Sequence, residues 1–290
     1  MLDQARISAN GVDFAYLHAG DPAAPLALCL HGFPDCAYTW RHLLPLLADA
    51  GYHAVAPFQR GYAPTSVPAD GRFQSGVLGV DANALHEALG GDDRAVIIGH
   101  DWGASGTWAA ATLAPDRWRK VVGMAVPLGN AIAIAFLTDT NSLKRSWYMF
   151  FFQTVIADIV VPANDLAFLD MLWNDWSPGY DASGDLPRIK ESLRDPANLT
   201  AALGYYRATL GTGLRDPELD AAQAATSAMP PQPTLYLHGA DDGCIGRNVA
   251  EIAAASAPGH VSIEFVDQAG HFLHLERPQL VNERILAFLG

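Results

Sequence analysis

Short, nearly continuous apolar runs recur through the first half of the chain, separated by more polar stretches. They span residues 26–30, 54–58, 95–98 and 121–126. Runs of this length and composition are typical of strands that are covered on both faces, as in a parallel sheet. Ahead of them, apolar and polar residues alternate loosely around Asn10-Gly11, a dipeptide that favours a tight hairpin because both positions tolerate positive φ. We expect an antiparallel ribbon followed by buried strands.

Stretches with helical character lie between these predicted strands. They span residues 39–50, 80–89 and 103–114. Two more strand-like runs, residues 234–237 and 261–266, come much later. The chain then ends on a helix whose apolar stripe consists of Val281, Ile285, Phe288 and Leu289. Alternation of strands and helices predicts the α/β class, with a mostly parallel central sheet flanked by helices.

The alternation stops between residues 128 and 228. This stretch is rich in aromatic residues and has no clear buried-strand run. It is therefore predicted to be a helical insertion. The expected organisation is a core domain of residues 1–127 and 229–290, interrupted by this insertion of residues 128–228.

Composition narrows the class of protein. Half of the residues are hydrophobic and 17% are charged, so the chain can bury a core and is not expected to be disordered. The 31 acidic residues outnumber the 18 basic ones, and the net charge of −13 would repel nucleic-acid phosphates and anionic lipids. Three cysteines without a paired spacing disfavour disulfides, and the first ten residues do not resemble a signal peptide. We expect a cytoplasmic protein without nucleic-acid or membrane partners; a homodimer is left open.

The sequence Gly99-His100-Asp101-Trp102-Gly103 stands between a predicted strand and a helix of small residues. It has the form of a nucleophile elbow, a sharp turn in which glycines two positions before and after the central residue avoid steric clashes. The central residue here is Asp101, and the dipole of the following helix favours its ionised form. An ordinary loop with an N-cap aspartate is the structural alternative for this motif alone.

The loop after the first buried run carries His31-Gly32-Phe33-Pro34. Such a loop can direct the backbone amide of Phe33 toward the same space as the amide of Trp102. Two backbone donors at that place would form an oxyanion hole. Taken alone, the motif could equally be a turn before a proline.

Two later strands end in candidate partners for the nucleophile. Asp241 and Asp242 follow one of them, and His271 follows the other. Ligands of open α/β sheets bind beyond the carboxyl ends of the strands. Asp101, an acid from the first pair and His271 are therefore expected to meet there as nucleophile, acid and base.

Together these blocks resemble the α/β-hydrolase superfamily, and more closely the epoxide hydrolases with an aspartate nucleophile, which are related to the haloalkane dehalogenases. The resemblance covers nearly the whole chain. The matching blocks are His31-Gly32-Phe33-Pro34-Asp35 with Trp40-Arg41, Arg60-Gly61-Tyr62 with Ser66, Gly99 to Gly103, and Gly270-His271-Phe272. In the acid loop the resemblance favours Asp242 over Asp241, although Gly246 stands where the family often has proline.

The resemblance implies a mechanism and further site residues. Asp101 would attack an epoxide carbon to form an alkyl ester, and His271, oriented by Asp242, would activate the water that hydrolyses it to a diol. The family's helical cap supplies two tyrosines that bind and protonate the epoxide oxygen, and by position these are Tyr148 and Tyr206. The other expected substrate contacts are His31, Pro34, Trp147 and Phe152. No cofactor and no metal are expected; the partners are a small hydrophobic epoxide and water.

Two other functions stay open. A haloalkane dehalogenase would use the same nucleophile and base, but its leaving halide needs N–H donors. Indole N–H groups are available from Trp102, Trp147, Trp173 and Trp176. Phe33 in place of a polar residue, together with the two tyrosines, favours the epoxide. A hydrolase-like scaffold that only binds a small molecule is the non-enzymatic alternative, because a fold alone does not exclude it.

Overall fold

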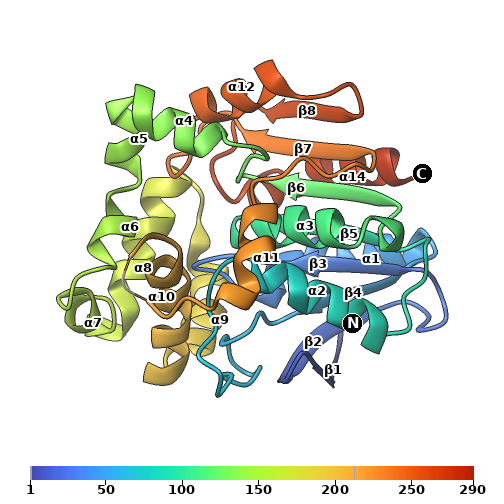
Figure 1. Cartoon of the computed structure of the whole chain (residues 1–290), viewed down its shortest axis with the longest axis horizontal. Coiled ribbons are helices and arrows are strands. Elements are labelled where there is room, and N and C mark those ends of the chain that lie inside the picture. The colour runs from blue at the N-terminus through green and yellow to red at the C-terminus, as the bar shows by residue number, and fades with distance from the viewer. Residues whose placement is uncertain (1, 212) are drawn as a thin grey trace.

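A computed structural model describes residues 2–211 and 213–290. Its centre is an eight-stranded sheet in the order β1-β2-β4-β3-β5-β6-β7-β8 (Figure 1). The strands are β1 (Asp3–Ala9), β2 (Val12–Ala19), β3 (Leu26–Leu30), β4 (His53–Pro57), β5 (Val96–His100), β6 (Lys120–Met124), β7 (Thr234–Gly239) and β8 (Val261–Val266). β2 pairs antiparallel with β1 and β4, and the strands from β4 to β8 are parallel. The predicted α/β class with a mostly parallel sheet is confirmed.

The ribbon at the edge of the sheet turns at Asn10 and Gly11. Their φ angles are 46° and 72°, the left-handed conformation that a two-residue hairpin requires. Ala9 pairs with Val12 across the turn, so this dipeptide alone joins β1 to β2. The hairpin forms where the sequence predicts it.

Alternate residues of the central strands face two different apolar layers. Leu26, Leu28 and Leu30 of β3 pack into one cluster, whereas Ala27 and Cys29 pack into the other. The helices on the first side are α2 (Val77–Ala88), α3 (Trp102–Leu113) and α12 (Arg247–Ser256), and those on the second are α1 (Leu44–Asp49) and α14 (Pro278–Leu289). Because helices cover both faces, all five residues of β3 are apolar.

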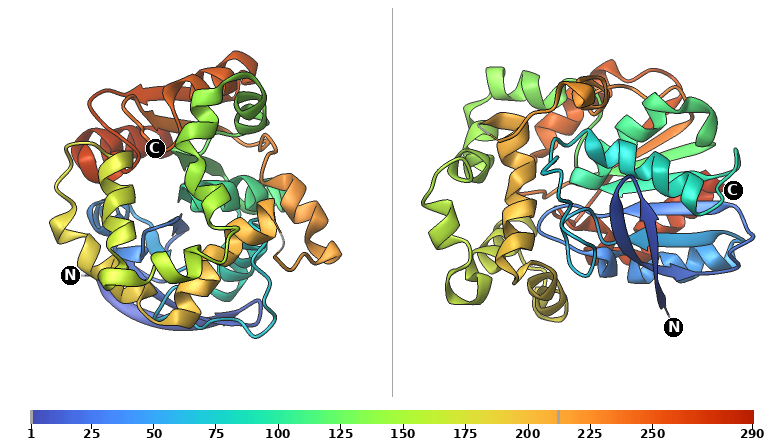
Figure 2. Two further views of the ribbon diagram at one scale, coloured as in Figure 1. Left: turned by 90° about the vertical axis from the view of Figure 1, so that its left-hand side faces the viewer. Right: turned by 60° about the horizontal axis from the view of Figure 1, so that its bottom comes forward.

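Between β6 and β7, the described chain forms helices and no strand. They are α4 (Ala131–Thr138), α5 (Thr140–Arg145), α6 (Trp147–Phe151), α7 (Ala157–Val160), α8 (Ala163–Trp176), η3 (Ala182–Gly184), α9 (Leu186–Leu193), α10 (Pro196–Leu210), η4 (Pro217–Leu219) and α11 (Asp220–Ala225). Most of them form a layer beyond the carboxyl ends of the strands (Figures 1 and 2). The first and last return to the core, because α4 packs on α12 and α11 packs on α3. The exact limits of a cap domain stay a prediction.

One predicted helix is divided in two. Residues 39–50 belong to η1 (Ala37–His42) and α1, which are separated by Leu43. Pro45 explains the break, because it has no N–H to donate to the preceding turn and its ring would clash with the carbonyl of Arg41. At the start of α1 the same proline is tolerated. Two short elements complete the fold, η2 (Pro115–Arg117) and α13 (Leu273–Glu276).

Helix length also bears on membrane topology. Among the described residues, no helix combines the length and the apolar character needed to traverse a bilayer.

Candidate active site

Asp101 occupies the turn between β5 and α3 in a strained conformation. Its φ and ψ angles are 54° and −123°, a combination that residues other than glycine rarely adopt. The two flanking glycines are required sterically. A Cβ atom on Gly99 would lie 2.2 Å from the carbonyl oxygen of Gly103, and one on Gly103 would lie 2.1 Å from the carbonyl oxygen of Leu30. The backbone therefore has the tight geometry that the spacing of these glycines predicts.

The carboxylate of Asp101 is held from two sides. The backbone N–H of Phe33 donates to Oδ1 at 2.7 Å, and Nε2 of His271 lies 3.5 Å from Oδ2. Gly32 permits the first contact, because a Cβ atom there would lie 2.2 Å from Oδ1. Trp102, the second expected donor, is the first residue of α3 and follows Asp101 directly. Within the described residues, Phe33 is the backbone donor that reaches the carboxylate.

His271 and Asp242 form a buried pair beside Asp101. Oδ2 of Asp242 lies 3.0 Å from Nδ1 of His271, and Oδ1 accepts two backbone N–H groups of the following loop at 2.8 and 2.9 Å. The neighbouring Asp241 is exposed. Gly246, the departure from the family pattern, has a φ of −64°, an angle that a proline ring could also adopt.

The charges of the site raise the pKa of His271 and lower the pKa of Asp101. Burial disfavours the charged form of His271, but the carboxylates of Asp242 and Asp101 outweigh burial and raise the pKa of His271 to about 10. Burial also disfavours ionised Asp101, yet the hydrogen bond and charge of His271 outweigh it and lower the pKa of Asp101. These shifts favour an ionised Asp101 beside a protonated imidazole in the free site.

Tyr148 on α6 and Tyr206 on α10 line the same pocket as Asp101 and come from the helical layer. Their side chains are buried, and their ring centroids lie 5.7 Å apart. Burial raises the pKa of both phenols well above their usual value, so both hydroxyls keep their protons at neutral pH. Two neutral O–H groups near an ionised carboxylate can donate to an oxygen that becomes negative during a reaction.

One pocket brings Asp101 and both tyrosines together. The remaining lining residues are mostly apolar: Trp102, Ser105, Val126, Ile132, Ala135, Phe136, Ser142, Ser146, Met149, Cys244, Ile245, Gly246 and Val249. α4 contributes Ile132, Ala135 and Phe136 to this apolar wall, and α12 contributes Val249. The pocket therefore suits a small hydrophobic ligand whose polar atom faces Asp101.

Three of the other expected substrate contacts are not among the residues that line the pocket: His31, Pro34 and Phe152. Phe152 packs against the rings of Phe33 and Tyr206, with centroids 5.6 and 5.0 Å away. His31 accepts a backbone N–H on Nε2 at 2.9 Å. The carbonyl of Pro34, which follows a cis peptide bond, accepts an indole N–H at 2.8 Å. These contacts hold the loop of Phe33 and the ring of Tyr206 in place.

The four tryptophans considered as halide donors are dispersed. Trp102 lines the pocket. Trp173 donates its indole N–H to a backbone carbonyl, and Trp176 packs against the ring of Tyr148 with centroids 4.8 Å apart. Trp147, also an expected substrate contact, is 41% exposed and packs against other aromatic residues of the helical layer. The structure does not bring Trp147 to the site.

Sequence patterns predict neither Cys244 as a site residue nor Trp176 as a neighbour of His271. Cys244 lines the pocket, and its position two residues after Asp242 is a signal that could have been used. Trp176 lies 5.1 Å from His271 between ring centroids. No local signal marks Trp176, because only the packing of α8 brings it there.

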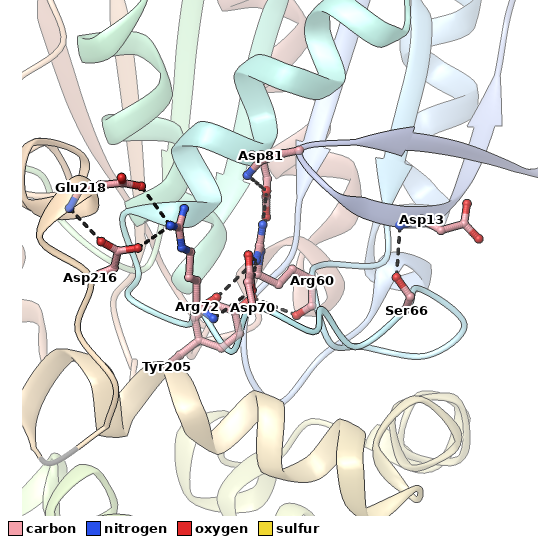
Figure 3. A network of polar contacts seen from close by, with 10 residues as sticks. Asp13, Arg60, Ser66, Asp70, Arg72, Asp81, Tyr205, Asp216 and Glu218 are labelled. Carbon is pink, nitrogen blue, oxygen red and sulfur yellow. Dashed lines mark hydrogen bonds and ion pairs between the residues drawn. The ribbon is translucent and has the colours of Figure 1, made fainter.

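A charged network fixes the loop after β4 against the helix that carries Tyr206 (Figure 3). Buried Arg60 donates to both carboxylate oxygens of Asp81 at 2.7 Å and lies 3.3 Å from Asp70. Tyr205 donates its hydroxyl to the carbonyl oxygen of Arg60 at 2.9 Å. Tyr205 directly precedes Tyr206 on α10. This hydrogen bond therefore links the loop after β4 to the helix turn that carries Tyr206.

Two groups of buried side chains bring metal-ligand atoms within 4.8 Å of one another. They are Asp35, His100 and His274, and Asp242, Cys244 and His271. A metal in the second group would have to break the bond between Asp242 and His271. In the first group, Nε2 of His100 lies 2.9 Å from the His271 carbonyl and Nε2 of His274 lies 2.5 Å from Thr39. We assign no metal to either group.

Comparison with known proteins agrees with this geometry. A family model described as the alpha/beta hydrolase fold matches residues 25–278. Epoxide hydrolase A of Mycobacterium tuberculosis is 32% identical, over 98% of this chain and 96% of its own length. AB hydrolase superfamily protein YfhM of Bacillus subtilis is 30% identical, also over 98% of this chain and 96% of its own length.

Solved structures match over equally long spans. Epoxide Hydrolase A from Mycobacterium thermoresistibile superposes with a TM-score of 0.78 at 28% identity, covering 100% of this chain and 98% of its own. The Bacillus megaterium epoxide hydrolase in complex with an inhibitor gives a TM-score of 0.82 at 26% identity, covering 98% of this chain and 99% of its own. The resemblance inferred from the sequence is confirmed: this chain belongs to the α/β hydrolase fold family, among relatives named epoxide hydrolases.

Proposed function

We propose that this protein hydrolyses epoxides to vicinal diols through a covalent ester on Asp101. One arrangement carries the proposal. Oδ1 of Asp101 binds the Phe33 amide, Oδ2 faces His271, and the same pocket presents two protonated tyrosines. The names of relatives that match 98% of the chain support the same reaction.

In the first step, Oδ2 of Asp101 attacks one epoxide carbon. The carbon–oxygen bond of the ring breaks, and its electron pair goes to the epoxide oxygen. Tyr148 and Tyr206 hydrogen-bond that oxygen, and one of them transfers its proton to it. The product is a neutral alkyl ester on Asp101 with a free hydroxyl, and a tyrosinate.

The charge of Asp101 is lost in the ester, so His271 first releases its proton, which returns to the tyrosinate through solvent. In the second step, neutral His271 removes a proton from water while Asp242 holds the imidazole in position. The hydroxide attacks the ester carbonyl, and the oxyanion that forms is stabilised by the amide of Phe33, with Trp102 as a second donor. The intermediate collapses to the diol and the Asp101 carboxylate. His271 keeps the proton taken from water, as in the free site, so the cycle consumes one epoxide and one water.

The pocket also indicates the class of substrate. Its wall is apolar apart from the carboxylate, the two phenols and a few small polar side chains. A compact, hydrophobic epoxide fits this surface better than a charged one. In this proposal the helices between β6 and β7 act as a cap that excludes bulk water from the ester.

Haloalkane dehalogenation is the second candidate, and one observation favours it. The indole N–H of Trp102 has no hydrogen-bond partner within the described residues, although Trp102 lines the pocket. A departing halide could accept that N–H. The two phenols favour the epoxide, because an alkoxide needs a proton whereas a halide does not.

One experiment separates these functions. The protein is given a single turnover of styrene oxide or of 1-bromobutane in ¹⁸O-water, and its peptides are analysed by mass spectrometry. Label on Asp101 with styrene oxide is the expected result. Label only with 1-bromobutane would indicate a dehalogenase. Epoxide that disappears equally in the Asp101→Ala variant would contradict the covalent mechanism, and binding without any turnover would indicate a binding protein.

A further inference from the structure

We propose that Cys244 is a positioning residue that directs the hydroxyl proton of Tyr148 into the pocket. This inference rests on the proposed function and concerns how one of the two proton donors is oriented. Sγ of Cys244 lies 3.3 Å from the hydroxyl oxygen of Tyr148, within hydrogen-bonding distance for sulfur. The contact joins the acid loop of the sheet domain to α6 of the helical layer.

The thiol itself is held rigidly. The backbone N–H of Cys244 donates to Oδ1 of Asp242 at 2.8 Å, and the side chain is 1% exposed. Asp242 in turn contacts His271 through its other oxygen. The loop that places the catalytic acid therefore also places the sulfur.

The ring of Tyr148 has little freedom to move. It packs against Phe152, Trp176 and Tyr206, with ring centroids 5.7, 4.8 and 5.7 Å away. With the ring fixed, the direction of the phenolic O–H bond is the main variable left at this donor. The only hydrogen-bond partner of that hydroxyl among the described residues is Cys244.

Burial keeps both groups neutral, because it raises the pKa of the Cys244 thiol and of the Tyr148 phenol well above their usual values. A neutral thiol can donate its single proton to the phenol oxygen. Tyr148 then keeps its own O–H for the epoxide oxygen. If the phenol instead donated to sulfur, its proton would point away from the substrate. Once Tyr148 gives up its proton, the same S–H group would stabilise the phenolate.

The second tyrosine offers a matched control. Tyr206 lines the same pocket, but no thiol lies within hydrogen-bonding distance of its hydroxyl in the described structure. An effect of Cys244 that acts through Tyr148 should therefore disappear when Tyr148 lacks its hydroxyl and persist when Tyr206 lacks it.

The test is a double-mutant cycle on the full chain. Cys244→Ala, Cys244→Val and Cys244→Ser are each made in the unaltered protein and in the Tyr148→Phe and Tyr206→Phe backgrounds. The rate of ester formation is measured with styrene oxide by rapid quench and mass spectrometry of the Asp101 peptide. Cys244→Val removes the S–H donor but nearly keeps the volume of the side chain. The test can therefore be read even if Cys244→Ala fails to fold.

We expect Cys244→Ala and Cys244→Val to slow ester formation by roughly 3- to 10-fold, the range for loss of one hydrogen bond. Cys244→Ser should restore most of the rate, because a hydroxyl keeps the donor. In the Tyr148→Phe background, Cys244→Ala and Cys244→Val should cause no further loss of rate. In the Tyr206→Phe background, each should reduce the rate further.

Equal effects in all three backgrounds, or a serine variant as slow as the valine variant, would overturn the proposal and leave the proposed function intact. If Tyr148→Phe forms the ester at an unchanged rate, both the role of Tyr148 and that of Cys244 are wrong. Absence of any ester on Asp101 would contradict the proposed function itself.

Discussion

Nε2 of His271 lies 3.5 Å from Oδ2 of Asp101, within ion-pair range but longer than an ordinary N–H···O hydrogen bond. The charge of each group therefore depends on the other. While Asp101 is ionised, it helps Asp242 hold the pKa of His271 at about 10. Conversion of Asp101 to a neutral ester would remove one of these two carboxylates. His271 would then lose its proton more easily in the intermediate than in the free enzyme.

We expect the two half-reactions to respond differently to pH. Ring opening needs ionised Asp101, whose pKa is lowered, so its rate should stay constant across neutral pH. Ester hydrolysis needs neutral His271, so its rate should rise with pH and level off through a pKa below about 10. Formation and decay of the alkyl-enzyme in single turnovers measure the two rates separately. A flat profile for hydrolysis would mean that His271 is not the base.

The two adjacent aspartates of the acid loop provide a paired test. Asp242→Ala should slow ester hydrolysis by on the order of 10²- to 10⁴-fold, because the imidazole loses the carboxylate that fixes its tautomer. The alkyl-enzyme should accumulate. Asp241→Ala should behave like the unaltered protein, since Asp241 is exposed. The intermediate is quantified by mass spectrometry of the intact protein, and accumulation in the Asp241 variant instead would reverse the assignment.

Removal of either pocket phenol should slow ring opening more than ester hydrolysis. Tyr148→Phe and Tyr206→Phe should each reduce ester formation by about 10-fold or more, because a proton donor is lost where negative charge develops. The double variant should be slower than either single one. Substrate binding, measured under conditions where no ester forms, should change little. Alkylation at an undiminished rate in the double variant would refute the role of both residues.

Arg60 and Arg72 test the network of Figure 3. Arg60→Ala would leave buried Asp81 without its partner, and such losses cost about 3–5 kcal/mol in the free energy of unfolding. Arg72 pairs with Asp216 and Glu218 nearer the surface, so Arg72→Ala should cost less than about 1 kcal/mol. Urea unfolding followed by circular dichroism measures both. Equal effects of the two variants would show that burial does not decide the contribution of these pairs.

The strands and the elbow can be predicted from local sequence patterns because they depend on the side chains and backbone angles of a few neighbouring residues. β3 begins and ends where the apolar run does, and Asn10-Gly11 adopts the angles that its two-residue turn demands. The elbow could be predicted because only glycine fits at Gly99 and Gly103 once the turn is tight. Each of these features depends on a few consecutive residues.

Packing between distant elements could not be predicted in the same way. Trp147 and Phe152 lie only five residues apart in one aromatic stretch, yet Trp147 is 41% exposed and Phe152 is fully buried. The sequence alone does not show which face of α6 meets the sheet domain. The contact of Cys244 with Tyr148 was missed for the same reason, since it joins residues 96 positions apart.

Asp35 should make stability depend on pH. Burial, only partly offset by hydrogen bonds from Thr39 and Cys36, raises the pKa of this carboxyl to about 8. A carboxyl with a raised pKa in the folded state contributes stability below its unfolded pKa, near 3.8, which is lost as pH rises toward 8. Asp35→Asn keeps the acceptor for the Cys36 amide but cannot ionise. The variant should therefore unfold at a similar temperature to the unaltered protein at acidic pH and at a temperature at least about 2–4 °C higher at alkaline pH, a shift equivalent to ~1 kcal/mol. Calorimetry across this pH range measures the difference, and a constant offset between the two proteins would show that Asp35 is ionised throughout.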